Sequence, residues 1–206
     1  MPQWLSSRPQ TRDDQRPLDP AELPADAGPV LLGLARATIS AELGLPLPTA
    51  EPPPWLRRPG ACFVTLTTAG ALRGCIGSIR AYRPLSEDVT GNASAAAFRD
   101  PRFPPLTAVE LADTAIEVSV LSPSTPLEVV DEQDALAQLR PGQDGLVLEY
   151  AGRRATYLPQ VWRSVRDRRE FLSHLKLKAG LPPDFWSDQL QLSRYTVTEF
   201  HEEVAR

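Results

Sequence analysis

Residues 72–77 read LRGCIG, and this stretch is the most unusual part of the chain. β-Strands disfavour glycine, because glycine packs poorly and loses entropy on ordering, so two glycines beside one cysteine need a reason. Side chains alternate between the two faces of a strand. This predicts one face with Leu72, Gly74 and Ile76, and another with Arg73, Cys75 and Gly77.

Two interpretations of Cys75 follow from its neighbours. A nearby cation favours the thiolate, the reactive form of cysteine, so Arg73 supports a nucleophilic or substrate-binding thiol. Free cysteine is also a commonly buried residue, and strand glycines often mark bulges or close packing. On the functional interpretation, Cys75 is the candidate catalytic residue, and Arg73, Gly74 and Gly77 are candidate substrate-binding residues.

The LRGCIG stretch forms the second arm of a predicted β-hairpin over residues 61–79, whose first arm is CFVTLTT (62–68). A two-residue turn at Ala69-Gly70 sets Cys75 opposite Val64. Cys62 is then a diagonal neighbour of Cys75, with Cα atoms roughly 7–8 Å apart. Most disulfides need closer Cα atoms, so we predict none.

Asn92 lies in a predicted alanine-rich helix over residues 85–99. It falls within the apolar stripe of that helix, and a buried amide is costly unless it is hydrogen-bonded. Its partner is either a neighbouring backbone or a ligand. We expect the backbone, in the LRGCIG strand or in residues 100–106, and keep Asn92 as a candidate substrate-binding residue.

Residues 100–106 read DPRFPPL, and three prolines exclude regular structure there. Arg102 therefore lies in a rigid loop. It either binds an anionic ligand, which makes it a further candidate substrate-binding residue, or it pairs with Asp100 or a helix end.

The remaining chain interleaves helices and strands without a regular βαβ repeat, which predicts an α+β fold with a mostly antiparallel sheet and flanking helices. Polar, charged and proline-bearing residues 1–25 predict a mobile tail, so the domain would span residues 26–206. Six prolines between Pro46 and Pro59 predict an extended linker. The other predicted helices lie between Asp26 and Gly44, after Thr107, which has capping-box spacing with Glu110, and over residues 131–139 and 167–179. The other predicted strands cover residues 116–122, a hairpin over 146–158, and 191–200.

Composition excludes several classes of protein. A net charge of −4 argues against a general nucleic-acid binder. The chain has no GxxxxGK[ST], GxGxxG or GxSxG motif. Two histidines and two cysteines are too few for a histidine-rich metal site or an iron–sulfur centre, so we expect no metal and no cofactor. Since no apolar run approaches the roughly 20 residues of a membrane helix and no signal peptide is visible, we expect a cytoplasmic protein without a membrane partner.

Five blocks occur in order along the chain: LRGCIG, NASAAAFRDPRFPPL, IEVSVLSP, GLVLEYAGRRATYLPQVW and FLSHLKLKAGLPPDFW. Together they resemble the AMMECR domain family, whose bacterial members are called AmmeMemoRadiSam system protein A. The resemblance covers roughly residues 28–200. It implies an α+β fold with a larger and a smaller lobe in one domain, and it implies that the LRGCIG segment lies near the groove between the lobes.

The bacterial family name implies association with a Memo-like protein and a radical S-adenosylmethionine protein, but the family carries no settled activity. Two hypotheses follow. In the first, the chain is an enzyme or substrate-binding subunit of such a system and acts on a small anionic or nucleotide-like substrate, with Cys75 as nucleophile or thiol ligand and Arg73, Arg102 and Asn92 orienting the substrate. In the second, it is a non-catalytic adaptor that docks partner proteins. The surroundings of the Cys75 sulfur distinguish the two.

Overall fold

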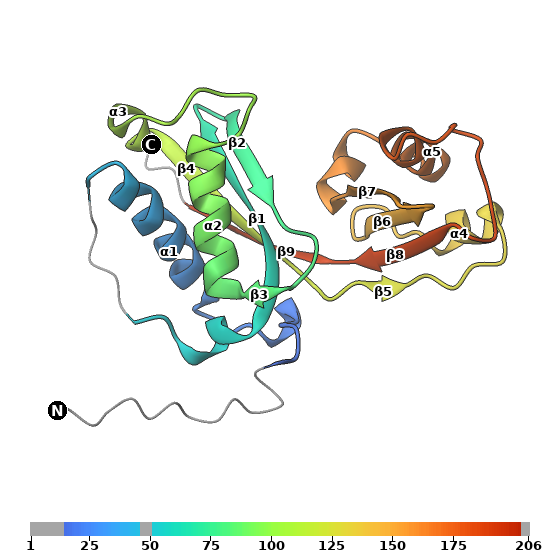
Figure 1. The fold of residues 1–206 in the computed structure, drawn as a ribbon, viewed down its shortest axis with the longest axis horizontal. Helices are drawn as coiled ribbons and strands as arrows, with labels where there is room; N and C mark the ends of the chain where they lie inside the picture. Colours follow the sequence, from blue (N-terminus) through green and yellow to red (C-terminus); the bar gives the residue numbers. More distant parts are fainter. Residues whose placement is uncertain (1–14, 46–50, 203–206) are drawn as a thin grey trace. The chain divides into compact units, whose positions relative to one another are not determined.

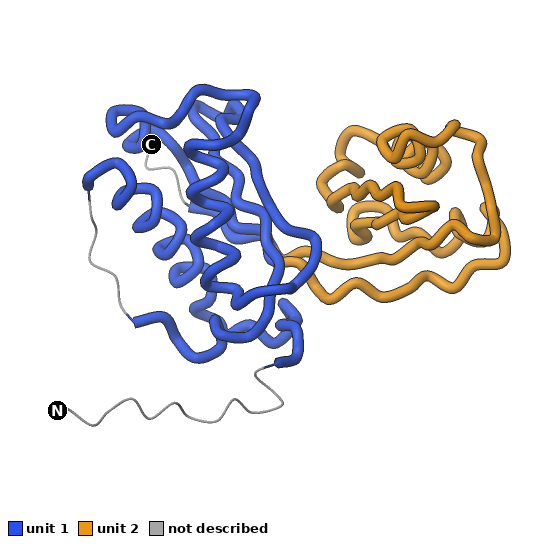
Figure 2. Tube along the Cα trace, in the orientation of Figure 1, with its two compact units in different colours: residues 1–120, 199–206 blue, residues 121–198 orange. Residues whose placement is uncertain are grey.

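The computed structural model describes residues 15–45 and 51–202. The chain folds into two compact units (Figure 2). Unit 1 contains the described residues up to Val120 together with residues 199–202, and unit 2 contains Leu121–Thr198. Each unit has its own sheet and its own hydrophobic core, and the mixture of helices and antiparallel strands confirms the predicted α+β class.

Unit 1 holds a sheet with the strand order β2-β1-β4-β9, and a short strand, β3, pairs with β1 (Figure 1). Strand β2 therefore lies at one edge of the sheet and β9 at the other. The elements of this unit are η2 (Pro20–Glu22), α1 (Ala27–Glu42), η3 (Pro54–Arg57), β1 (Pro59–Thr68), β2 (Ala71–Gly77), β3 (Arg83–Pro84), α2 (Leu85–Phe98), α3 (Ala108–Leu111), β4 (Thr114–Leu121) and β9 (Val197–His201).

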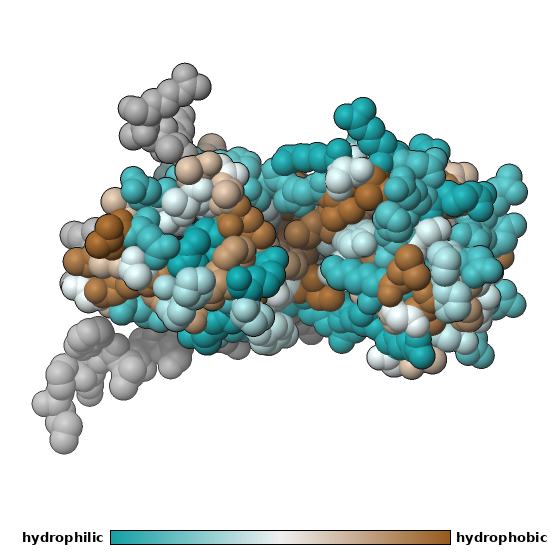
Figure 3. Space-filling model, turned by 90° about the horizontal axis from the view of Figure 1, so that it is seen from above, coloured by the Kyte–Doolittle hydropathy of each residue, from teal (hydrophilic) through white to brown (hydrophobic). Residues whose placement is uncertain are grey.

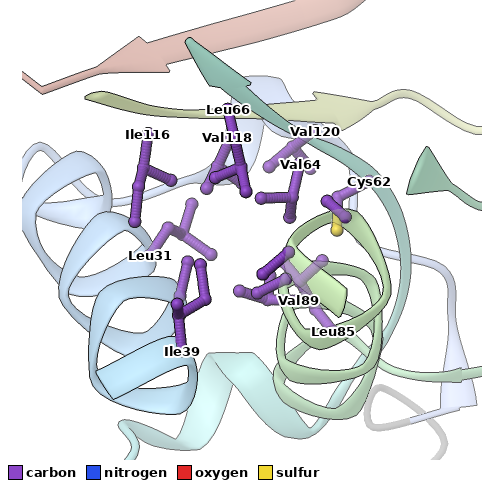
Figure 4. Close-up of a cluster of buried hydrophobic side chains, with 14 of the residues drawn as sticks. Leu31, Ile39, Cys62, Val64, Leu66, Leu85, Val89, Ile116, Val118 and Val120 are labelled. Atoms are coloured by element: carbon purple, nitrogen blue, oxygen red, sulfur yellow. The ribbon is translucent and has the colours of Figure 1, made fainter. Parts of the chain in front are cut away.

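Helices α1 and α2 cover one face of this sheet, as Figure 4 shows. The strands contribute alternate residues to the core, because successive side chains point to opposite faces. The core-facing residues of the strands are Cys62, Val64, Leu66, Ile116, Val118 and Val120. They pack against apolar residues of the two helices, which include Leu31, Ile39, Leu85 and Val89.

Unit 2 holds a sheet with the strand order β5-β8-β6-β7. Its elements are β5 (Thr125–Pro126), α4 (Glu132–Gln138), β6 (Gly145–Tyr150), β7 (Arg153–Tyr157), η4 (Pro159–Arg163), α5 (Arg168–Lys178) and β8 (Gln191–Tyr195). In its core the rings of Trp162 and Phe171 stack with centroids 3.8 Å apart. Hydrophilic residues cover most of the visible surface of this unit in Figure 3.

The predicted mobile tail over residues 1–25 needs correction from residue 15 onward, while residues 1–14 lie outside the described chain. Leu18 is only 1% exposed, and its N–H donates to the Pro59 carbonyl at 2.7 Å. Arg58 also binds the Glu22 carboxylate at 2.7 Å. Leu18, with the buried Pro20, thus anchors a polar segment to the core, and composition alone hides such a contact.

The structure also differs from the predicted linker and from the predicted last strand. Residues 46–50 of the linker lie outside the described chain, and η3 places Leu56 in the core. The predicted strand over residues 191–200 is two strands, β8 and β9, which belong to different sheets and are separated by Thr196. Among the described residues, no helix is long and apolar enough to cross a membrane.

Candidate functional site

A β-bulge in β2 sets the position of Cys75. The turn pairs Thr68 with Ala71 as expected, but the register shifts between Leu66 and Thr67. Leu72 pairs with Thr67 and Gly74 with Leu66, so Arg73 is the extra residue. Cys75 consequently lies opposite Thr65 and not opposite Val64. The predicted register was wrong by this one residue, and both cysteines are free thiols.

Cys75 lies on the face of the unit 1 sheet that points away from α1 and α2. Its neighbours Gly74 and Ile76 pair with Leu66 and Val64, which face the helices, so alternation turns Cys75 the other way. We call this the distal face. The Thr65 hydroxyl donates to the Cys75 sulfur there at 3.4 Å, and Cys75 is half-buried.

Both glycines of the motif allow close packing. A Cβ on Gly74 would lie 2.2 Å from the Ala96 carbonyl oxygen of α2. A Cβ on Gly77 would lie 2.2 Å from the Phe63 ring and 2.7 Å from the Cys62 carbonyl oxygen. Real Cβ atoms do not approach this closely, so packing alone accounts for both glycines.

Arg102 and Asp100 hold the outer edge of β2 at Cys75. The Cys75 N–H donates to Asp100 Oδ2 at 2.9 Å, and Arg102 Nη2 donates to the Cys75 carbonyl at 3.1 Å. Arg102 also donates to Asp100 at 2.6 Å, and this hydrogen bond holds the pKa of Asp100 well below its ordinary value. These side chains supply the hydrogen bonds that another strand would supply at an exposed edge. Arg102 therefore pairs with Asp100, one of its two predicted roles.

Arg73 is also bound to a carboxylate. Its Nε donates to Glu110 Oε1 at 3.0 Å, and its guanidinium lies 5.9 Å from the centroid of the Phe103 ring. Glu110 belongs to the predicted capping box of α3 with Thr107. The hydrogen bond from Arg73, followed by those from Thr107, lowers the pKa of Glu110 to about 2. Arg73 Nη1 is buried and has no hydrogen-bond partner among the described residues.

Asn92 binds the backbone of β1 instead of the two segments that we favoured. Its Nδ2 donates to the Cys62 carbonyl and to Asp88 Oδ2, both at 3.0 Å. The fully buried Asp88 accepts the Cys62 N–H at 2.8 Å and hydrogen bonds from Ser78 and Arg83. Burial, and next the charge of Asp88, raises the pKa of the Cys62 thiol well above its ordinary value.

The distal face also carries acid–base groups that the sequence did not single out. His201 Nδ1 lies 3.3 Å from Glu117 Oε2, and His201 Nε2 lies 3.5 Å from Glu199 Oε2. Ser119 donates to Glu117 Oε1 at 2.9 Å. The available signal was the alternation of IEVSVLS, in which Glu117 and Ser119 alternate with the core-facing Ile116, Val118 and Val120, although Ser119 is itself buried.

His201 does not serve as a base for Cys75. Strand β9 is three positions from β2 in the sheet, and neighbouring strands lie about 4.8 Å apart, so the two side chains are about 14 Å apart across the sheet. The other histidine of the chain, His174, is an exposed residue of α5 in unit 2. Over residues 15–45 and 51–202 the structure also brings together no group of three His, Cys, Asp or Glu residues that could hold a metal ion.

Comparison with known proteins identifies one family model and several similar proteins. The family model described as AMMECR1 matches residues 32–200. A protein of Methanothermobacter thermautotrophicus is 41% identical over 193 residues, which cover 89% of this chain and 98% of the relative. A protein of Methanocaldococcus jannaschii is 41% identical over 149 residues, which cover 68% of this chain and 72% of the relative. The crystal structure of an uncharacterized protein from Pyrococcus horikoshii aligns with a TM-score of 0.76 at 35% identity, over 85% of this chain and 91% of that one.

Proposed function

The chain belongs to the AMMECR1 family, and on that premise we propose that it is the binding component of a multi-protein system, not a self-contained thiol enzyme. The partners that we propose are a Memo-like protein and a radical S-adenosylmethionine protein, as the name of the bacterial members suggests. The distal face around Cys75 is the proposed binding surface.

The observation that carries this proposal is the set of contacts around Cys75. Catalysis by a cysteine nucleophile needs an adjacent base or another group that lowers the thiol pKa. The Thr65 hydroxyl donates to the Cys75 sulfur and Arg102 also interacts with the Cys75 side chain, but the imidazole of unit 1, on His201, lies about 14 Å away across the sheet, too far to act as the base. Arg73 and Arg102, which would orient an anionic substrate, are bound to Glu110 and Asp100.

The distal face instead offers the mixed chemistry of a recognition surface. It presents a thiol and a hydroxyl on neighbouring strands, and carboxylates with an imidazole at the other edge. Such groups fix the orientation of a polar ligand or of a partner surface. The close packing behind Gly74 and Gly77 keeps the strand that bears Cys75 in one position.

Two substitutions of Cys75 separate binding from thiol chemistry. Cys75→Ser keeps the size of the side chain but removes the thiol, whereas Cys75→Trp fills the space above β2. We expect Cys75→Ser to retain association with the purified partner proteins, and the activity of the reconstituted system, to within about tenfold, a change of about 1.4 kcal/mol. We expect Cys75→Trp to abolish both.

The steric control is Leu177→Trp, which introduces the same indole ring at an exposed position of α5. It should leave association unchanged. Loss of all activity in Cys75→Ser, with association intact, would show a thiol reaction and overturn the binding role. Absence of association of the unaltered chain with both partners, measured by sedimentation velocity, would overturn the multi-protein part of the proposal.

A further inference from the structure

A second polar site lies in unit 1, at the end of the sheet that carries the β1–β2 turn. A pocket of about 750 Å³ opens there between α1, this turn, the start of β4 and the end of β9. Its volume falls within the range of about 300–1,000 Å³ that small-molecule sites occupy. Cys75 is not among its lining residues.

Arg36 lines this pocket but does not make it an anion site, because other groups already use its donors. Its Nε donates to Glu202 Oε1 at 2.6 Å, and its Nη2 donates to Glu202 Oε2 and to the Thr114 carbonyl. Its Nη1 donates to the Leu111 carbonyl at 3.3 Å. The charges of Arg36 and Glu202 therefore offset each other.

Asp113 supplies the charge that remains. It lines the pocket and is exposed, and its carboxylate forms no hydrogen bond or ion pair with any residue in the described ranges. The other ionisable lining group, His201, lies between Glu117 and Glu199, so any positive charge on it is already matched by two carboxylates. The pocket and its immediate neighbours carry an excess of negative charge.

The rest of the lining is small and mostly apolar. Leu32, Ala69, Ala112 and Ala115 form apolar walls, and Thr68 adds a hydroxyl group. Such walls accept a short aliphatic chain, while the unpaired carboxylate favours a ligand with a positive charge. We propose that this pocket binds a small organic cation, whose ammonium or guanidinium group pairs with Asp113 and whose aliphatic part lies against the alanines.

The test titrates the full chain with agmatine, which joins an ammonium to a guanidinium through four methylene groups, and follows backbone amide shifts by NMR. We expect saturable shifts centred on residues 68–69 and 112–115. Butyrate, an aliphatic chain with a negative charge, should produce no saturable shift there. Because Asp113 is exposed, Asp113→Asn should raise the Kd of agmatine about fivefold.

Two control variants make the result specific. Asp113→Glu, which keeps the charge, should retain agmatine binding. Asp188→Asn, which removes an exposed carboxylate from unit 2, should leave the Kd unchanged. Equal affinity in Asp113→Asn and the unaltered chain, butyrate binding as strong as agmatine binding, or shifts spread over both units would each overturn the assignment.

Discussion

Cys62 and Cys75 lie on paired strands of one hairpin but on opposite faces of the sheet. Cys62 faces the helices, is fully buried and lies in the hydrogen-bond network of Asp88 and Asn92. Cys75 faces the other side and contacts the hydroxyl of Thr65. The comparison shows that the helix-covered side fixes Gly74 against α2, whereas Gly77 packs against Phe63 and Cys75 points to the side that α1 and α2 do not cover.

Thiol labelling gives the largest expected difference between the two sides. Cys75 should react with iodoacetamide at least about 10³-fold faster than Cys62, because Cys62 becomes accessible only when the core opens at a cost of several kcal/mol. The raised pKa of Cys62 slows its reaction further, since the thiolate is the reactive form. Peptide mapping after timed labelling measures the ratio, and comparable rates for the two thiols would contradict the assignment.

The free energies of unfolding of an Asp88 variant and an Asp100 variant test the same comparison. Asp88 of α2 is fully buried and binds groups from three other segments, so Asp88→Ala should cost about 3–5 kcal/mol of unfolding free energy. Asp100→Ala should cost less, about 1–3 kcal/mol, because its partner Arg102 is half-exposed and water can solvate it. Urea titration of both variants gives the order, and a larger loss for Asp100→Ala would refute the comparison.

Substitution of Asn92 should give the next largest loss of stability. Asn92→Ala leaves the Cys62 carbonyl without this donor, which should lower the unfolding free energy by about 1–3 kcal/mol. The matched control, Thr90→Ala, removes a more exposed hydroxyl from the same helix and should change stability by less than about 0.5 kcal/mol. Unchanged stability in Asn92→Ala would assign its amide to ligand binding instead.

The ion pair between Arg73 of β2 and Glu110 of α3 gives the smallest expected effect. The pKa of Glu110 is lowered from 4.5 to about 2, so the pair contributes stability above pH 4.5 and loses it as the pH falls towards 2. Because Glu110 is partly exposed, we expect only about 0.2–1 kcal/mol. Glu110→Gln should remove this part of the pH dependence between pH 5 and 2 in thermal unfolding, and an identical pH profile would contradict the role of the pair.

The features that the sequence predicts well depend on residues that are close together in the chain. The turn at Ala69-Gly70 places both residues at positive φ, 51° and 77°, and this geometry depends on the turn itself. The capping box of Thr107 and Glu110 likewise depends on residues three apart and was predicted. Such features need no information from distant parts of the chain.

The features that the sequence did not predict depend on distant partners. The bulge at Arg73 brings Gly74 against Ala96 of α2, and a hairpin pattern does not contain that contact. Leu18 binds the Pro59 carbonyl across forty residues of chain. His201 lies beside Glu117 of β4, and this contact between two strands cannot be read from the spacing of residues along β9.

The short crossing at Thr196 has a consequence for how the molecule folds. The Ser122 N–H donates to the Thr196 carbonyl at 2.9 Å, and the Thr196 N–H donates to Ser122 Oγ at 3.0 Å, so unit 2 begins and ends at adjacent points. Pairing β4 with β9 in an otherwise unfolded chain would have to close a loop of residues 122–196, and the entropic cost of closure grows with the logarithm of loop length. Once unit 2 has folded, its two ends are already together and that cost is largely removed. Unit 2 is thus an insertion between β4 and β9, and its folding lowers the entropic cost of pairing these two strands.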